Sequence, residues 1–438
     1  MTQRSCRYAA TGGSGYRNRR GIVGAASAAA LALALAACGG VGEQGGDDTA
    51  AVTLELVGNQ DQTEPTEALV RAYESENPNV RIETSYLPVD QAQTALRTRL
   101  GAGNAPDLFV AWPGNGSAMS TVQLAQAGLL EPISGQEWLD GVPSSLRSLL
   151  GHEGEDYLWS AGVTVIGTIY NESVFDEHDI QIPQTWDDLL ATCAQLQDIG
   201  IAPFALANQT PWVTQLVSYA IAPSVAFGSN PDLAQEMMTG EATFSNSGWR
   251  QTLQQYMEMD ERGCFNDNAN GTTLEQAISM LADGDAAMMV QVSGIYQQVE
   301  EVSEGRAEYA MFPFPASGNF EDLRIPAGIS SGLVASPTGD HVEVAKDFLS
   351  FAGQEEQMEM FAAANSALPF VVEDATSLDP ILQPFVPYME NDMAIPFMDQ
   401  EWPNAEVQPT HFAVIQELFS DAITVDEALE KLDTAYAG

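Results

Sequence analysis

Short apolar segments alternate along the chain with longer segments in which apolar residues recur at helical spacing. Residues 52–57, 80–84 and 107–112 have the alternating or wholly apolar pattern of β-strands, and residues 66–76 and 91–100 between them have the pattern of helices. Polar turns rich in Gly, Asn and Pro separate these elements. Strands that alternate with helices over short connections are typical of a parallel α/β sheet.

The same alternation returns in the second half of the chain. Roughly 390 residues follow the amino-terminal segment, which is more than one hydrophobic core usually holds, so two α/β lobes are expected. The further expected strands are 163–170, 202–206, 286–292 and 333–336, and the further expected helices are 186–200, 214–222, 274–282 and 342–351.

The first forty residues have the layout of a secretory signal. Five arginines and no acidic residue precede an apolar run, residues 22–37, which is too short and too rich in small side chains for a membrane-spanning helix. The small residues before Cys38 resemble a bacterial lipobox, which implies cleavage before Cys38 and diacylation of its thiol. Two acyl chains give stable anchoring where one does not. The alternative is an ordinary signal peptide with a chance cysteine. Because of Arg19-Arg20, the export route stays open between the general secretory and the twin-arginine route.

The segment after the cleavage site is polar. Residues 38–51 are rich in Gly, Asp, Glu, Gln and Thr, and we expect a flexible tether there. With residues 1–37 removed as the signal peptide, the protein would be extracytoplasmic and lipid-anchored to the outer face of the cell membrane. No later segment holds eighteen uninterrupted apolar residues, so the lipid anchor is the only expected contact with the membrane.

The chain is strongly acidic, with 61 acidic and 16 basic residues and a formal net charge of −45. Five of the basic residues precede Cys38, so the mature chain is more negative still. Such a field repels nucleic acid, anionic membrane surfaces and anionic ligands. We therefore expect no nucleic-acid partner and a neutral or cationic ligand, with most acids forming a solvated surface suited to high salt.

The four cysteines divide by position. Cys6 lies in the signal and Cys38 at the expected anchor, which leaves Cys193 and Cys264 in an oxidising compartment. We expect them to form one disulfide, with two free thiols as the alternative, because sequence does not fix the distance between their Cα atoms. The four histidines show no metal-ligand spacing, so no metal or other cofactor is expected.

Polar and aromatic residues follow several of the expected strands. In open α/β sheets, ligands bind beyond the carboxyl ends of the strands. Trp, amide and carboxylate side chains at such a place suit a polyhydroxylated ring, because its C–H faces pack on aromatic rings and its hydroxyls need directional partners. The candidate ligand-binding residues are Gln60, Asp61, Trp112, Asn115, Asn208, Trp212, Gln291, Ser293, Ser330 and Trp402.

The order of several segments resembles the extracellular solute-binding proteins of ABC sugar importers (family 1), which include maltodextrin-binding proteins; the amino-terminus resembles an actinobacterial-type lipoprotein. The resemblance covers essentially the whole mature chain, and order rather than any single motif carries it. The segments are Ala105-Pro106-Asp107-Leu108-Phe109-Val110, Ile169-Tyr170-Asn171, Ile182-Pro183-Gln184-Thr185-Trp186, Phe312-Pro313-Phe314-Pro315, Gly328-Ile329-Ser330-Ser331-Gly332 and Ala345-Lys346-Asp347-Phe348-Leu349.

The resemblance implies a two-lobed periplasmic-binding-protein fold of type II. Each lobe would have a mostly parallel sheet with flanking helices, and a hinge would join the lobes. The chain would cross between them near Gly162, Phe314 and Val371. Lobe 1 would then be 52–162 plus 315–371, and lobe 2 would be 163–314 plus 372–438.

The resemblance also assigns roles to residues by position. Gln60 and Asp61 match contacts of the first loop with the ligand, and Trp112 matches an aromatic contact. Trp212 and Trp402 match aromatic platforms for a sugar. The segment 291–294 lacks the Trp expected of a maltodextrin binder, which argues against maltodextrin itself as the ligand.

Catalysis is the main alternative to binding. Gly328-Ile329-Ser330-Ser331-Gly332 fits the G-x-S-x-G pattern, but a strand-like segment follows where a nucleophile elbow needs a helix, so we expect no catalytic residue. A secreted, lipid-anchored glycoside hydrolase with two carboxylates, and an anchored carbohydrate sensor, stay open as alternatives. The main hypothesis is a monomeric, non-enzymatic subunit that captures a sugar or oligosaccharide between its lobes and delivers it to the transmembrane subunits of an ABC permease.

Overall fold

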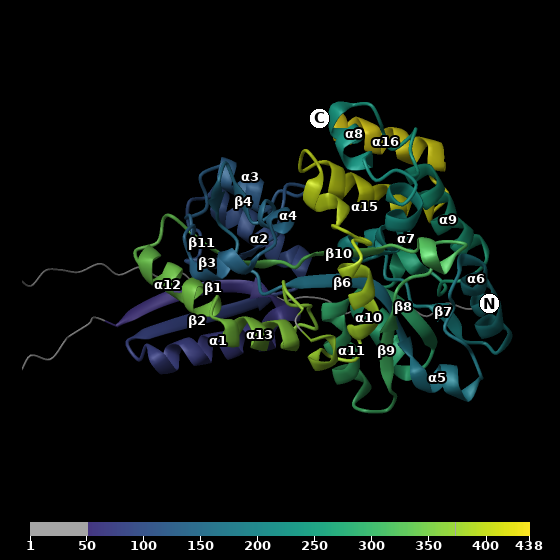
Figure 1. Ribbon diagram of the computed structural model, residues 1–438, viewed down its shortest axis with the longest axis horizontal. Helices are drawn as coiled ribbons and strands as arrows, with labels where there is room; N and C mark the ends of the chain where they lie inside the picture. Colours follow the sequence, from purple (N-terminus) through teal and green to yellow (C-terminus); the bar gives the residue numbers. More distant parts are fainter. Residues whose placement is uncertain (1–50, 373) are drawn as a thin grey trace, which may run out of the picture. The chain divides into compact units, whose positions relative to one another are not determined.

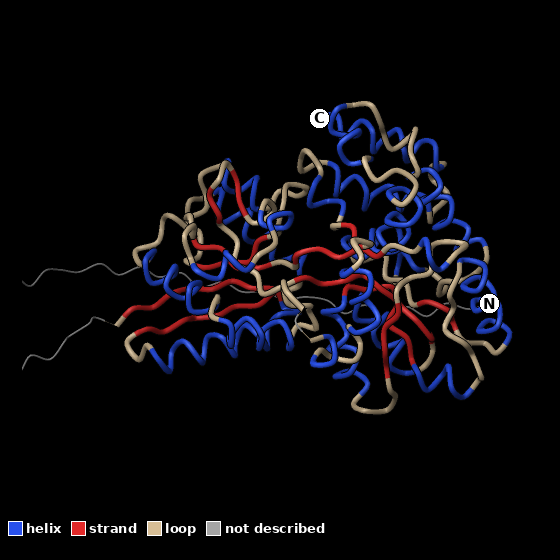
Figure 2. Tube along the Cα trace, viewed as in Figure 1, coloured by secondary structure: helices blue, strands red, loops and turns tan. Residues whose placement is uncertain are grey.

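The computed structural model describes residues 51–372 and 374–438, which form two main sheets with flanking helices (Figures 1 and 2). The expected α/β class is therefore confirmed. The expected signal peptide, the lipidation site Cys38 and the tether up to residue 50 lie outside the described residues. Within the described part, no helix is both long enough and apolar enough to cross a bilayer.

The first sheet has four strands in the order β11-β3-β1-β2. β1 pairs in parallel with β2 and β3, and β11 runs antiparallel to β3. Its strands are β1 (Val52–Asn59), β2 (Val80–Leu87), β3 (Leu108–Ala111) and β11 (Gly332–Ala335).

Both faces of the first sheet are buried, because successive side chains of a strand point to opposite faces. Leu54 and Leu56 of β1 pack into a core with helices α1 and α12, and Val57 packs into a second core with α2. Figure 1 shows α1 and α13 along one face of the sheet and α2 along the other. The helices are α1 (Thr63–Glu76), α2 (Val89–Gly101), α3 (Thr121–Gln126), α4 (Ser144–Arg147), α12 (Val342–Ala352) and α13 (Glu355–Ala364), and a small hairpin joins β4 (Gly151–His152) to β5 (Glu155–Asp156).

The second sheet has the order β12-β10-β6-β8-β7, with β9 also paired to β6. Three of its five pairings are antiparallel, namely those of β6 with β8, β9 and β10. The expectation of a mostly parallel sheet is thus wrong for this lobe. β10 must oppose β6 because β6 carries the chain away from the first sheet and β10 carries it back. The strands are β6 (Val163–Asn171), β7 (Ala202–Phe204), β8 (Ala286–Val292), β9 (Tyr309–Phe312), β10 (Ile325–Ile329) and β12 (Ala394–Ile395).

Helices surround the second sheet and share one large core with it. The expected helices at 186–200 and 274–282 are confirmed, whereas 214–222 begins as a 3₁₀ turn, Pro211–Gln215. The helices are α5 (Glu172–Glu177), α6 (Trp186–Asp198), α7 (Leu216–Ala222), α8 (Leu233–Thr239), α9 (Trp249–Glu261), α10 (Leu274–Asp283), α11 (Tyr296–Ser303), α14 (Val386–Glu390), α15 (Val407–Leu418) and α16 (Val425–Ala437).

The chain changes sheets at short connections. Trp159 pairs with Leu333 in the first sheet, and β6 begins at Val163 in the second. Only Ser330 and Ser331 separate β10 of the second sheet from β11 of the first. Since β10 lies inside the range 315–371 expected for lobe 1, we propose that the middle crossing is at these two serines rather than near Phe314.

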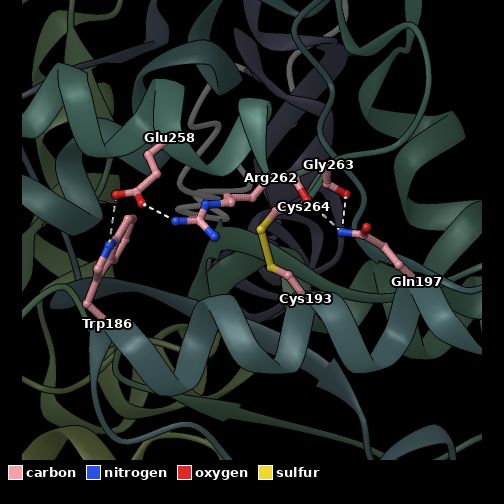
Figure 3. The surroundings of a disulfide bond; sticks show 7 residues. All are labelled: Trp186, Cys193, Gln197, Glu258, Arg262, Gly263 and Cys264. Atoms are coloured by element: carbon pink, nitrogen blue, oxygen red, sulfur yellow. Dashed lines mark hydrogen bonds and ion pairs between the residues drawn. A yellow bond between two sulfur atoms is a disulfide. The ribbon is translucent and has the colours of Figure 1, made fainter.

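A disulfide joins α6 to the turn after α9, as expected from the two cysteines (Figure 3). Cys193 and Cys264 are fully buried, and their Cα atoms lie 5.2 Å apart. Gln197 of α6 reinforces this junction, because its Nε2 donates to the carbonyl oxygens of Arg262 and Gly263 at 2.8 and 2.9 Å.

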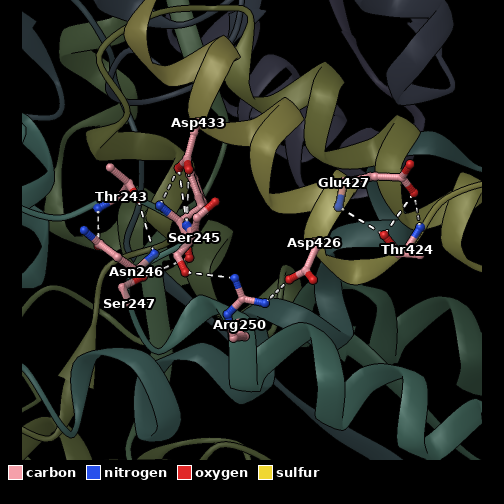
Figure 4. A network of polar contacts seen from close by, with 10 residues as sticks. Thr243, Ser245, Asn246, Ser247, Arg250, Thr424, Asp426, Glu427 and Asp433 are labelled. Atoms are coloured by element: carbon pink, nitrogen blue, oxygen red, sulfur yellow. Dashed lines mark hydrogen bonds and ion pairs between the residues drawn. The ribbon is translucent and has the colours of Figure 1, made fainter.

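The carboxy-terminal helix α16 is held by a polar network (Figure 4). Thr424 and Glu427 form a capping box at its start, which satisfies backbone N–H groups that the helix itself leaves free. Asp426 pairs with Arg250 of α9, and the Asp433 carboxylate accepts hydrogen bonds from the backbone N–H groups of Phe244 and Ser245. These contacts fix α16 against the core of the second sheet.

Candidate functional site

A cavity of about 130 Å³ lies where strand ends of the two sheets meet. The wall on the side of the first sheet comes from the carboxyl ends of its parallel strands. Asn59 ends β1 and Asp61 follows it, Asp90 follows β2, and Trp112 follows β3. This is where the geometry of an open α/β sheet places a ligand.

The opposite wall is built from more distant parts of the chain. Ile166 at the start of β6, Val292 at the end of β8 and Ile329 at the end of β10 form its apolar floor. Around this floor lie side chains from the turn before α7, from α7, from the segment 397–400 and from α15. They are Trp212, Gln215, Leu216, Tyr219, Phe397, Asp399, Gln400, Gln408 and Phe412.

Four of the ten candidate residues line this cavity: Asp61, Trp112, Trp212 and Ser330. The rings of Trp112 and Trp212 are only partly buried, as expected for rings that face an open space. The first-sheet wall therefore carries a Trp and a carboxylate, and the other wall carries a second Trp.

Trp402 belongs to the protein core instead. It is only 4 % exposed and packs edge-on against Tyr219 and against His411, with ring centroids 6.1 and 5.8 Å apart. Phe397, five residues earlier, takes the aromatic position in the cavity. The assignment of Trp402 as a sugar platform is not supported, because core packing accounts for its indole ring.

The buried polar candidates also lie outside the cavity lining. Adjacent residues of a strand point to opposite faces, so Val292 lines the cavity and Gln291 does not. Gln291 and Ser293 are fully buried, and the Ser293 Oγ lies 3.4 Å from the backbone N–H of Val165, whose hydrogen bond it accepts. Asn208 is likewise fully buried.

The remaining two candidates flank the cavity. Gln60 is exposed next to Asp61. Asn115 holds the two walls together: its backbone N–H donates to the Gln400 carbonyl at 3.2 Å, and its Nδ2 donates to the Pro403 carbonyl at 2.7 Å.

Two glycines make this contact between the walls possible. A Cβ atom at Gly114 would overlap the backbone of Gln400, and a Cβ atom at Gly116 would overlap that of Asp399. Gly114 also has a positive φ of 72°, which disfavours other residues. The loop after β3 thus touches the main chain of the residues whose side chains line the far wall.

Burial perturbs the acids of the cavity. It raises the pKa of Asp61 to about 6 and that of Asp399 to about 6, and it also raises the pKa of Asp90. The Oδ2 atom of Asp399 accepts a hydrogen bond from Gln408 Nε2 at 2.9 Å. Behind this wall, burial lowers the pKa of His411 to about 3, so that ring is neutral.

Several residues of the lining were not expected from the sequence. Asp90 follows β2, and the rule that pointed to the ends of β1 and β3 applies to it equally. Tyr219, Asp399 and Phe412 lie on helical segments, where spacing along the chain does not identify a cavity-facing side chain.

The site lacks the local structure of a serine nucleophile elbow. Ser330 is followed by β11 rather than by a helix. Among the described residues, no group of three or more His, Cys, Asp or Glu is arranged to hold a metal ion.

Residues 68–380 match the family of bacterial extracellular solute-binding proteins, and the chain belongs to that family. Its members act outside the cytoplasm as binding proteins. Among curated relatives, the multiple sugar-binding protein of Streptococcus mutans is 22% identical over 395 residues, which cover 87% of this chain and 89% of the relative.

Solved structures show the same two-lobed fold. A chitin oligosaccharide binding protein superposes with a TM-score of 0.74 and 21% identity, covering 88% of this chain and 98% of its own. A sugar transporter of Bacillus licheniformis in complex with stachyose has a TM-score of 0.69 and 19% identity, covering 88% of this chain and 99% of its own. The periplasmic-binding-protein fold expected from the sequence is therefore confirmed.

Proposed function

We propose that the protein is the extracytoplasmic substrate-binding subunit of an ABC importer and that it captures a sugar. The observation that carries this proposal is the cavity between the two sheets, which Asp61, Trp112 and Trp212 line. Aromatic rings pack on the C–H faces of a sugar, and the carboxylate accepts hydrogen bonds from its hydroxyls. The names of the multiple sugar-binding relative and of the oligosaccharide-binding structures support the same ligand class.

The size of the cavity favours a small ligand. One water needs about 10–15 Å³ of such volume, so 130 Å³ holds on the order of ten waters, which is comparable to the heavy atoms of one hexose.

The ligand is released unaltered in this proposal, and two lobes that open and close around the site provide capture and release. The test is to incubate the purified protein with mono-, di- and oligosaccharides and to record both thermal unfolding and reaction products. A rise in Tm without products is expected. Products would show a glycoside hydrolase instead, and no shift with any sugar would contradict the sugar as ligand.

Further parts of the proposal concern the membrane and the assembly. We propose that acylated Cys38 anchors a monomer to the outer face of the cell membrane, where the loaded protein docks on the permease. The small residues before Cys38 support the anchor. Replacing Cys38 by Ser should move the protein from the membrane fraction to the soluble fraction, and unchanged fractionation would contradict it.

A further inference from the structure

Three buried acceptor atoms on residues that line the cavity have no hydrogen-bond partner among the described residues, and neither has the Tyr219 hydroxyl, which can donate as well as accept. Asn59 and Gln400 are 1 % and 5 % exposed, and both line the cavity. The Gln400 Nε2 donates to the Ile329 carbonyl at 2.8 Å, while its Oε1 has no donor. Asn59 Oδ1 and Asp61 Oδ1 also have no hydrogen-bond donor. Buried acceptors without donors are costly, so these atoms point to a ligand that supplies N–H or O–H groups.

All charged side chains that line the cavity are acidic. Asp61, Asp90 and Asp399 line the cavity, and no Arg, Lys or His occurs among the described residues that line it. The pKa values of the three acids are raised by burial, which fits the lack of a cation beside them.

Aromatic rings occupy much of the remaining lining. Trp112 lies on one wall, and Trp212, Tyr219, Phe397 and Phe412 lie on the other. The faces of such rings attract cations as well as C–H groups.

We propose that the natural ligand carries a protonated amine, so that it is an amino sugar with a free amino group rather than a neutral sugar. This inference rests on the proposed function, because it assigns a chemical class to the ligand of the same cavity. An ammonium group has three donors and no acceptor, whereas each hydroxyl also brings lone pairs that need donors. It can therefore donate to such acceptors without needing a donor itself, and its charge compensates the carboxylates of the lining.

The test uses matched pairs of sugars that differ only in the amine. Isothermal titration calorimetry at pH 7 compares D-glucosamine with D-glucose and N-acetyl-D-glucosamine, and D-galactosamine with D-galactose and N-acetyl-D-galactosamine. In at least one series we expect the free amine to bind about tenfold or more tightly than both neutral partners, which is the scale of one charge-assisted contact.

Variants then locate the preference. Asp61→Asn and Asp399→Asn keep the shape of each side chain and should reduce the preference for the amine to about threefold or less. Asp198→Asn is the matched control, because it removes the same charge from an exposed position at the end of α6 and should leave the preference intact. Thermal unfolding checks that each variant is folded, and Asp90→Asn serves as the substitute for one that is not.

The outcomes separate the two proposals. Equal or tighter binding of the neutral partners overturns the inference of an amine and leaves sugar capture standing. Binding of neutral oligosaccharides without binding of any amine has the same meaning. No binding of any sugar overturns both. A preference for the amine that survives in both Asp61→Asn and Asp399→Asn, as in the Asp198→Asn control, contradicts the assignment to this acidic lining.

Discussion

The two walls of the cavity are built in different ways. The first-sheet wall consists of residues at or shortly after the carboxyl ends of β1, β2 and β3, so strand order largely places them. The second wall combines strand ends with α7, the segment 397–400 and α15, which are far apart in sequence. The first wall is thus a property of sheet geometry, whereas the second depends on how helices pack around a single large core.

The two tryptophans Trp212 and Trp402 show what this difference teaches. Trp212 lies in the 3₁₀ turn before α7, and Trp402 directly follows another 3₁₀ turn, Met398–Glu401. Each is next to a proline in the sequence. Trp212 is partly exposed in the cavity, and Trp402 is buried against Tyr219 and His411. On this wall a ring's role is set by tertiary packing, and substitutions can test that division.

The largest expected effect is on stability, at Trp402. Trp402→Ala should lower the free energy of unfolding by about 3–5 kcal/mol, because it leaves a cavity in the core. Denaturant unfolding measures this loss. If Trp402→Ala keeps its stability but loses sugar binding, the division between core and cavity is wrong.

The next largest effect concerns the disulfide in the body of the second sheet. Replacing both Cys193 and Cys264 by Ser should cost about 2–4 kcal/mol, since the bond closes a loop with a sequence separation of 71 residues. Urea unfolding of the variant, with the oxidised natural protein as the reference, measures the cost, and the reduced natural protein is the control for the Ser substitutions. A double variant as stable as the oxidised protein would show that the packing around α6 suffices.

A smaller effect is expected at two partly buried acids, Asp61 and Asp399, one on each wall. The folded-state pKa values of Asp61 and Asp399 lie near 6, above the usual 3.8, so the folded protein binds more protons than the unfolded chain between about pH 4 and 6. Their contribution to stability is full below about pH 4 and is lost as the pH rises through about 6.

Asp61→Asn and Asp399→Asn should therefore each stabilise the ligand-free protein at pH 7, by at most about 3 kcal/mol, and the gain should vanish near pH 4. The difference in Tm between each variant and the natural protein, measured across this pH range, tests the prediction. A gain that is independent of pH, or one that Asp198→Asn reproduces, would point to the net charge of the molecule instead.

The smallest expected effect is on affinity, at Trp212. Trp212→Ala should weaken sugar binding about tenfold, the scale of one lost stacking contact, and should change stability far less than Trp402→Ala does. Titration calorimetry measures the affinity, and Trp212→Phe, which keeps an aromatic face, should recover part of it. Unchanged affinity in Trp212→Ala would remove this ring from the ligand contacts.

Much of the fold could be predicted from the sequence because the pattern is locally consistent. The apolar alternation of β1 and the buried run of β3 predicted both strands and the ligand-facing ends that follow them. β10 was not expected, since Pro326 interrupts its pattern; the structure places Pro326 opposite Ile395 of the two-residue strand β12.

The far wall could be predicted only in part. The fully buried Gln291 and the cavity-facing Val292 are neighbours, so a register error of one residue exchanges a ligand contact for a core residue. The sequence also pointed to Trp402 where Phe397 lines the cavity. A 3₁₀ turn, Met398–Glu401, separates the two rings, and the side chain that enters the cavity cannot be read from their spacing. The residues that follow the expected strands predicted a site with Trp, amide and carboxylate side chains, but not which side chains of the far wall converge on it.

The contact of Gly114 and Gly116 with residues 399–400 involves main-chain atoms, which every amino acid has. Side chains that choose the ligand can consequently be exchanged without redesigning the junction that holds the walls together. Related proteins that keep the two glycines would keep the contact between the walls while their ligand specificity changes. In this way the range of ligands within a family of importers can widen with few compensating substitutions.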